Sequence, residues 1–126
     1  MRQFAISTGH PKTTGAARVI LSDGGNAIDA AIAAFAMSWV AEPCMSSAGG
    51  GAFAMVYYQG EHPRLFDFFP VTVNFGDTTE VFHVGKASIA VPGSVAGIFA
   101  LHEAFGTIPL TVLFEPAILA AKKDFF

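Results

Sequence analysis

The first chemical question about this sequence is which side chain could act as a nucleophile. Cys44 is the only cysteine among the 126 residues, so no disulfide can form within the chain. It follows the predicted end of a helix and precedes Ser46 and Ser47, with no activating base beside it in the sequence. A partly buried, unreactive thiol is therefore favoured over a catalytic cysteine.

The spacing of the other polar residues does not indicate a metal or phosphate site. The histidines are His10, His62, His83 and His102. They share no metal-ligand spacing such as the i, i+4 pair of zinc proteases, and His102 is predicted to be a packed core residue. The glycine run at residues 49–51 precedes a strand and lacks the lysine of a phosphate-binding loop, so close backbone approach is its predicted use. Glu42 and Asp67 would form a carboxylate pair only if the tertiary fold happened to bring them together.

Apolar periodicity and breaker residues predict the helices that must position these side chains. The predicted helices span residues 11–23, 26–41 and 94–105, with a fourth from residue 117 onward. Pro116 is expected to divide that last helix from a short turn at residues 110–114. Between the first two helices, Gly24 and Gly25 predict a tight joint, Asn26 predicts a helix cap, and Asp29 lies in the first turn near the positive end of the helix dipole.

Two strands are predicted, at residues 52–58 and 64–69, joined as a hairpin through a turn-rich segment at 59–63. The first strand is apolar on both of its alternating faces, which predicts that both faces are covered. Residues 71–86 show no sustained periodicity and are expected to form a long loop with short extended pieces.

Four segments, in their order along the chain, resemble the opening of the large subunit in the gamma-glutamyltransferase family. They are residues 24–31 with 40–43, residues 49–53, residues 90–97, and residues 105–109 with 116–118. The resemblance runs from about Ser7 to Phe125. It implies an α+β fold of the N-terminal nucleophile hydrolase type, an αββα sandwich of which only the N-terminal part is present. Residues 1–126 are then expected to be an incomplete portion of a single domain.

The resemblance also implies how catalysis would work and where the nucleophile would lie. In that family an autocatalytic cut exposes a threonine at the start of the small subunit, where its hydroxyl and free amine serve as nucleophile and base. A terminal amine suits the role of base because its pKa is close to neutrality. That threonine belongs to a segment beyond Phe126, so no catalytic residue is expected in this chain.

The large subunit of the family contributes an arginine that binds the α-carboxylate of the γ-glutamyl group, within a motif of an acid, a variable residue, arginine and glutamate. The matching stretch here is Asp67-Phe68-Phe69-Pro70. Phe69 stands at the arginine position and cannot donate a hydrogen bond to a carboxylate. Arg64 is not expected to replace it, because an odd offset along a strand places Arg64 on the opposite face. Phe68 and Phe69 are therefore predicted to bind substrate by shaping a pocket for a more apolar or differently anchored acyl group, as in the related cephalosporin acylases.

Composition excludes two other classes of function. The formal net charge is −3 and the seven basic residues are scattered, which disfavours nucleic-acid binding. The longest apolar run, residues 30–41, is shorter than the roughly 18 residues that a membrane span needs. No signal peptide is visible, so a cytoplasmic location is expected as the sequence is written, and a periplasmic or secreted one if a leader was removed.

The predicted function is that of an N-terminal fragment of an amide hydrolase or acyltransferase acting on glutathione or another γ-glutamyl or acyl amide. No cofactor is implied. The expected partners are the downstream part of the large subunit and the small subunit of the same precursor. The alternative is a non-catalytic α/β scaffold or binding module, a truncated remnant of the family. A longer reading frame with a threonine after a processing loop would favour the enzyme, and a genuine stop codon after residue 126 the alternative.

Overall fold

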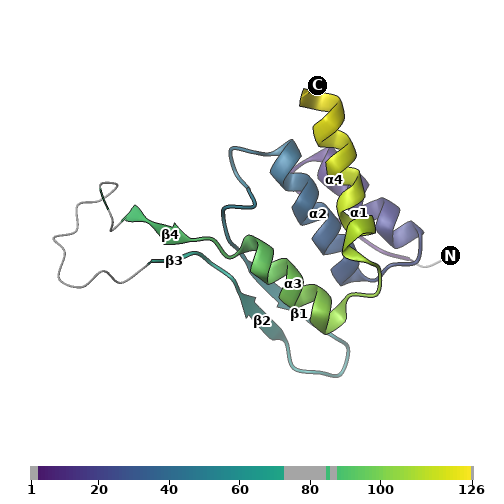
Figure 1. Cartoon of the computed structure of the whole chain (residues 1–126). Coiled ribbons are helices and arrows are strands. Elements are labelled where there is room, and N and C mark those ends of the chain that lie inside the picture. Colours follow the sequence, from purple (N-terminus) through teal and green to yellow (C-terminus); the bar gives the residue numbers. More distant parts are fainter. Residues whose placement is uncertain (1–2, 73–84, 86–87, 126) are drawn as a thin grey trace.

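A computed structural model of the chain describes residues 3–72, 85 and 88–125. Its helices are α1 (Pro11–Ser22), α2 (Ala27–Ala41), α3 (Ser94–Phe105) and α4 (Leu110–Phe125). Its strands are β1 (Phe53–Val56), β2 (Arg64–Asp67), β3 (Val71–Thr72) and β4 (Ala90–Val91). The four helices gather on one side, the β1–β2 hairpin lies beneath α3, and the β3–β4 ladder extends away from both (Figure 1). Most of the predicted loop at 71–86 lies outside the described residues.

The joint between α1 and α2 forms as the glycine pair predicts. Gly24 has a φ of 96°, a left-handed conformation that a residue with a Cβ rarely adopts. Asn26 then caps α2, because its Oδ1 accepts hydrogen bonds from the N–H groups of Ile28 at 2.7 Å and Asp29 at 2.9 Å. The Asp29 carboxylate accepts in return from the Asn26 N–H at 3.0 Å, which completes a capping box. Gly24 therefore fixes the end of α1, and Asn26, Ile28 and Asp29 fix the start of α2.

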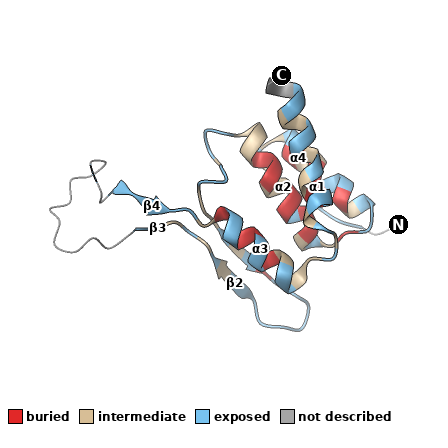
Figure 2. Ribbon diagram, in the orientation of Figure 1, coloured by how far each residue is buried: buried red, intermediate tan, exposed pale blue. Residues whose placement is uncertain are grey.

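Helix α2 is the centre of the helical group and packs against α1, α3 and α4. Buried residues recur along its length, as the red segments of its ribbon show (Figure 2). The buried apolar residues of the main core are Ala17, Ile20, Ala30, Ile32, Ala33, Val56, Ile98, Leu101 and Leu113. All four helices and β1 therefore contribute to one core. No helix in the described part of the chain combines the length and apolar character that crossing a bilayer requires.

The predicted break at Pro116 is wrong, because α4 runs without interruption from Leu110 to Phe125 with the proline inside it. Proline removes one hydrogen bond and crowds the preceding turn, at a cost of about 3 kcal/mol in a helix interior. Leu113 and Ala117, on either side of it, are 0% and 6% exposed. Their burial, together with the edge-to-face contact between Phe114 and Trp39 at 5.9 Å, offsets that cost.

The predicted hairpin is confirmed, with strands shorter than expected. β1 and β2 are antiparallel, with Phe53 opposite Asp67 and Val56 opposite Arg64. The inner face, which carries Val56 and Phe66, packs on the core. Within the described chain the helices cover only the inner face, so the cover expected over the other face is not supplied by these residues. The outer face is exposed, and Phe53, Met55 and Leu65 there keep 58%, 73% and 61% of their surface open.

Candidate functional site

The segment at residues 67–70, where the arginine-containing motif would lie, follows directly on β2. The Phe68 N–H donates to the Ala52 carbonyl at 3.1 Å, which extends the strand ladder by one residue. The Asp67 Oδ1 accepts from the Phe69 N–H at 3.0 Å, so this carboxylate is engaged by its own turn. Because strand side chains alternate between faces, Phe68 and Phe69 point to opposite sides of the hairpin. They therefore do not share one pocket within the described chain.

Phe69 lies on the outer face, where its ring stacks on that of Phe53. The ring centroids are 5.4 Å apart and the planes differ by 9°. Both rings remain more than half exposed, at 57% for Phe69 and 58% for Phe53. The position that an arginine would occupy is thus one half of an open aromatic platform, the Phe53–Phe69 pair, with no hydrogen-bond donor of its own.

Phe68 points the other way, toward the helices. Its ring lies 6.2 Å from that of Phe35 in α2 and packs so closely on Gly97 of α3 that a Cβ at that glycine would overlap it. Together with Ile98 and Leu101 it lines an apolar cavity of about 200 Å³ between the hairpin, α2 and α3. Phe68 therefore belongs to the packing that holds the hairpin to the helices. Its predicted role in binding substrate, like that of Phe69, stays a prediction.

The glycine run confirms the prediction of close backbone approach. The Gly50 carbonyl accepts hydrogen bonds from the N–H groups of Gly93 at 2.9 Å and Ser94 at 3.0 Å, at the start of α3. A Cβ on either Gly51 or Gly93 would overlap the Phe68 carbonyl. Three backbone segments far apart in the sequence therefore meet with no room for side chains between them.

Arg64 does not reach Phe69, as the strand offset predicts. Its guanidinium forms an exposed ion pair with Glu61 at 3.2 Å and lies over the ring of Phe105, 5.5 Å from the centroid. Phe105 belongs to α3, on the helical side of the hairpin, whereas Phe69 is on the outer side. The two residues are thus separated by the strand itself.

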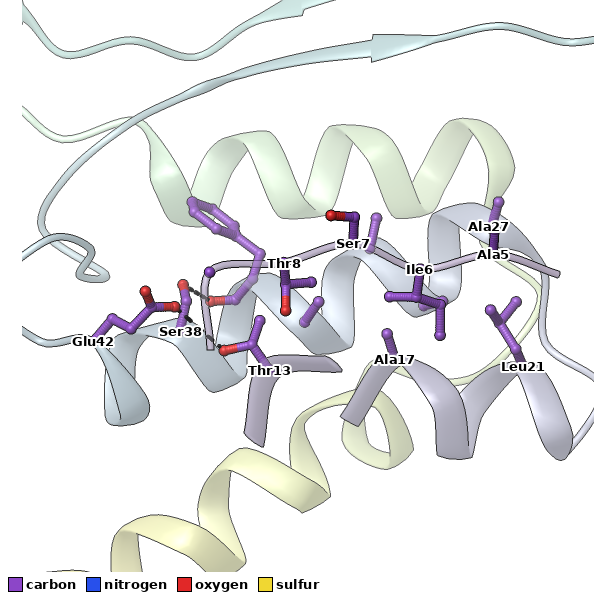
Figure 3. Close-up of a pocket in the computed structure, with 15 residues that line it drawn as sticks. Ala5, Ile6, Ser7, Thr8, Thr13, Ala17, Leu21, Ala27, Ser38 and Glu42 are labelled. Atoms are coloured by element: carbon purple, nitrogen blue, oxygen red, sulfur yellow. Dashed lines mark hydrogen bonds between the residues drawn. The ribbon is translucent and has the colours of Figure 1, made fainter. Parts of the chain in front are cut away.

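Another cavity lies between the N-terminal segment at residues 5–9 and the helices α1 and α2, with a volume of about 480 Å³ (Figure 3). Its lining is apolar along most of its length and polar at the end near Glu42. There the Thr13 hydroxyl donates to the Glu42 carboxylate at 3.5 Å, and the Ser38 hydroxyl donates to the Phe35 carbonyl at 2.7 Å. Neither Phe68 nor Phe69 lines this cavity.

Asp29 is the described group whose pKa is clearly shifted. Burial, with 0% of the residue exposed, would raise the pKa of its carboxyl. Hydrogen bonds from the Thr107 hydroxyl and from the N–H groups of Asn26, Thr107 and Ile108 favour the carboxylate, and the pKa falls below its ordinary value of 3.8. Asp29 thus joins the start of α2 to the turn before α4, which is a structural role.

The remaining candidates give no catalytic or metal centre within the described chain. Cys44 is exposed. His102 is partly buried and its Nε2–H donates to the Ile108 carbonyl at 2.7 Å, whereas His83 lies outside the described residues. No cluster of three or more His, Cys, Asp or Glu side chains in the described ranges could hold a metal ion. Glu42 and Asp67 do not form a pair. Sequence reasoning did not single out Phe53 as the partner of Phe69, although the hairpin register makes it the neighbour of Asp67.

Comparison with solved structures defines the class of protein first. The chain superposes with a TM-score of 0.82 on the transpeptidase CapD of Bacillus anthracis, at 30% identity, covering 94% of this chain and 39% of that one. The gamma-glutamyltranspeptidase of Pseudomonas nitroreducens complexed with L-DON gives 0.81 at 28% identity, covering 94% and 38%. The α+β fold is that of the N-terminal nucleophile hydrolases, as predicted, in the part that this chain covers.

Sequence comparison then shows the family. The gamma-glutamyltranspeptidase family model matches residues 13–125. The glutathione hydrolase proenzyme of Pseudomonas aeruginosa is 37% identical over 117 residues, covering 84% of this chain and 21% of the relative. The acylase ACY 1 proenzyme of Pseudomonas sp. strain SE83 is 32% identical over 139 residues, covering 95% and 25%. The chain belongs to the gamma-glutamyltranspeptidase family, and it spans about a fifth to a quarter of the length of these relatives.

Proposed function

We propose that this chain is the N-terminal portion of a gamma-glutamyltransferase-like amide hydrolase or acyltransferase whose threonine nucleophile lies outside the 126 residues. The observation that carries the proposal is the outer face of the hairpin. Large apolar side chains there are more than half exposed, namely Phe53, Met55, Leu65 and Phe69. Burying such side chains stabilises a fold by about 1.5 to 3 kcal/mol each, so a face of this kind favours a covering layer. The downstream part of the same precursor would supply that layer.

The substrate we propose is an amide with an apolar acyl group. Phe69, which stacks on Phe53, is the residue that the resemblance aligns with a carboxylate-binding arginine, and a phenylalanine ring offers dispersion and stacking but no charge. Losing a charge-assisted pair with a substrate carboxylate costs about 1.5 to 3 kcal/mol, or roughly one to two decades in kcat/KM. The name of the acylase ACY 1 proenzyme describes that relative's activity, and an acylase role is consistent with this platform.

In the reaction we propose, this chain positions substrate and does no proton transfer. The outside threonine would attack the amide carbonyl, form an acyl-enzyme and release the amine, after which water or a second amine would take the acyl group. Phe69 and Phe53 would hold the acyl group against the outer face. Phe68, fixed between Gly97 and Phe35, would keep the turn at residues 67–70 in place.

A chimera tests this proposal. The equivalent N-terminal residues of the Pseudomonas aeruginosa glutathione hydrolase proenzyme would be replaced by this chain. We expect autocatalytic cleavage into two subunits, visible on a denaturing gel. The second readout is the ratio of kcat/KM for a γ-glutamyl anilide to kcat/KM for a matched anilide lacking the α-carboxylate. We expect this ratio to be about 10- to 100-fold lower in the chimera than in the parent enzyme. The 126-residue chain alone should release no amine.

The Phe69→Arg variant of the chimera should recover most of that loss, because it restores the charged donor. Met55→Arg is the matched control, since it places the same charge on the same outer face at a position that the motif does not specify. Recovery by both variants would point to a general charge effect and contradict the Phe69 argument. A chimera that folds but neither cleaves itself nor turns over either anilide would favour the non-catalytic scaffold instead.

A further inference from the structure

A third cavity, apart from the Phe53–Phe69 platform, lies at the start of α3. It has a volume of about 400 Å³ and is bounded by the loop after α2, by the glycine run and by the first residue of α3. Its lining residues are Phe35, Pro43, Cys44, Met45, Ser46, Ser47, Gly50, Gly51, Ala52 and Ser94. None of them is charged, but the backbone and three hydroxyls give the cavity a polar wall. We call it the α3 cavity.

The helix end at this cavity favours negative charge. α3 has 12 residues, and its N-cap, Gly93, has no side chain to accept from the first N–H groups. The N–H groups of Gly93 and Ser94 are satisfied by the Gly50 carbonyl. The aligned peptide dipoles still place a partial positive charge at this end of α3.

Ser94 supplies the observation that points to a ligand. The residue is 0% exposed, and its Oγ has no hydrogen-bond partner anywhere in the described chain. A buried hydroxyl without a partner is costly, and most buried side-chain polar atoms in proteins are paired. Because Ser94 lines the α3 cavity, a group bound there would supply the partner that this hydroxyl lacks.

Gly50 leaves open the space in which such a group would fit. A Cβ built on Gly50 would lie 3.3 Å from the Ser47 carbonyl oxygen, 3.6 Å from the Ser47 Oγ and 3.7 Å from the Ser94 Oγ, so that point is flanked by two hydroxyls and one carbonyl. A Cβ on the neighbouring Gly49 would meet only the Ser47 Oγ, at 3.8 Å. Glycine at position 50 therefore keeps clear the space between two donors.

We propose that the α3 cavity binds a small monocarboxylate, with the Ser94 hydroxyl donating to the carboxylate and the positive end of α3 stabilising its charge. A single negative charge suits a wall of neutral donors, whereas phosphate dianions are usually matched by arginine or lysine, which the lining lacks. Phe35 and Met45 provide apolar surface for the short chain of such an acid. The site does not depend on the proposed amide chemistry, since binding needs no turnover.

The thiol of Cys44 offers a direct measurement, because it is exposed and lines the same cavity. Alkylation of Cys44 by neutral iodoacetamide would be timed in the 126-residue chain with propionate, propionamide or inorganic phosphate at constant ionic strength. We expect propionate to slow the reaction saturably, by about tenfold at nine-tenths occupancy, and to raise Tm. Propionamide and phosphate should have little effect.

Two variants remove the site by different routes. Ser94→Ala deletes the donor and should abolish protection by propionate. It should also raise Tm of the ligand-free chain by about 2 to 4 °C, because an unpaired buried hydroxyl is lost. Gly50→Ala fills the space between the hydroxyls and should abolish protection too. Gly49→Ala is its matched control and should keep protection.

The proposal fails if propionamide protects Cys44 as well as propionate does, since binding in the cavity would then not depend on the charge of the ligand. It also fails if phosphate protects more strongly than propionate, or if Ser94→Ala leaves protection by propionate intact. A lower Tm of ligand-free Ser94→Ala would show that the hydroxyl has a structural partner. That result would contradict the inference independently of any binding measurement.

Discussion

The helical side of the hairpin and its outer face differ in how far their side chains are buried and hydrogen-bonded within this chain. On the helical side, Ile32, Ile98 and Leu113 are at most 1% exposed, and the buried carboxylate of Asp29 accepts four hydrogen bonds. On the outer face, Met55 and Leu65 are 73% and 61% exposed, although the same two strands carry both faces. The side chains on the helical side are packed within this chain, whereas the outer face is as apolar as a core but stays exposed.

This contrast shows that a strand pair can belong to two cores. The inner residues of β1 and β2 pack on α2 and α3, and these contacts stabilise the hairpin even when its outer face is not covered. The outer residues would contribute only when a second layer is added. Substitutions on the two faces should therefore have very different effects on the stability of the 126-residue chain.

The largest effect is expected on the helical side, at Asp29. Asp29→Ala removes a carboxylate that accepts from Thr107, Asn26 and Ile108, and leaves those donors unpaired. We expect a loss of about 3 to 4 kcal/mol in the free energy of unfolding, measured by urea denaturation. Asp23→Ala, at the exposed end of α1, is the control and should change stability by less than about 0.5 kcal/mol. Equal losses of stability in the two variants would contradict the stabilising role of the Asp29 hydrogen bonds.

The same carboxylate gives a prediction for pH. Because the folded state lowers the pKa of Asp29 below 3.8, its stabilisation is fully present above that value and is lost as the pH falls through the folded pKa. The wild-type chain should thus lose stability below about pH 4, beyond what Asp29→Ala loses over the same range. Parallel pH profiles for the two proteins would contradict this assignment.

An intermediate effect is expected at the contact between the two regions. Gly97→Ala would place a Cβ against the ring of Phe68, and we expect a loss of about 1 to 3 kcal/mol from overpacking. Gly15→Ala in α1 is the matched control, because no other atom lies within 4 Å of its added Cβ. It should stabilise the chain by up to about 1 kcal/mol through helix propensity. If both variants stabilise, the hairpin does not pack on α3 as described.

The smallest effect on stability, and the largest on association, is expected on the outer face. Leu65→Lys should change the free energy of unfolding by less than about 0.5 kcal/mol, since the side chain is already exposed. It should reduce the self-association that we expect of the isolated chain, measured by sedimentation velocity. Val19→Lys, on an exposed apolar residue of α1, is the control and should leave association unchanged. A strictly monomeric wild-type chain would show that the outer face needs no cover.

Local patterns in the sequence were sufficient for most of the helical side. Asn26 and Asp29 predict a cap because the groups they bind lie two or three residues away. The glycine run predicts close approach because it lacks the lysine and the following helix of a phosphate-binding loop. The fold class followed from a resemblance over most of the chain. The opposite placement of Arg64 and Phe69 followed from the alternation of a strand.

Tertiary packing decided what local patterns could not. A proline often ends a helix, but α4 continues through Pro116 because the burial of Leu113 and Ala117 on either side stabilises it. The exposed outer face of the hairpin depends on what is packed against it, which an apolar strand pattern does not state. The unpaired hydroxyl of Ser94 likewise arises where α3 meets the glycine run, from residues more than 40 positions apart.

The hydrogen bond from the Thr107 N–H to Asp29 joins residues 78 positions apart, and so sets an order of events on the ribosome. At about 5 to 20 residues per second, about 4 to 16 s pass between the synthesis of Asp29 and that of Thr107. The capping box of α2 is complete in sequence at the start of that interval, whereas the Thr107 donors are added only at its end. The network that buries the Asp29 charge can therefore close only after the chain has reached residue 107.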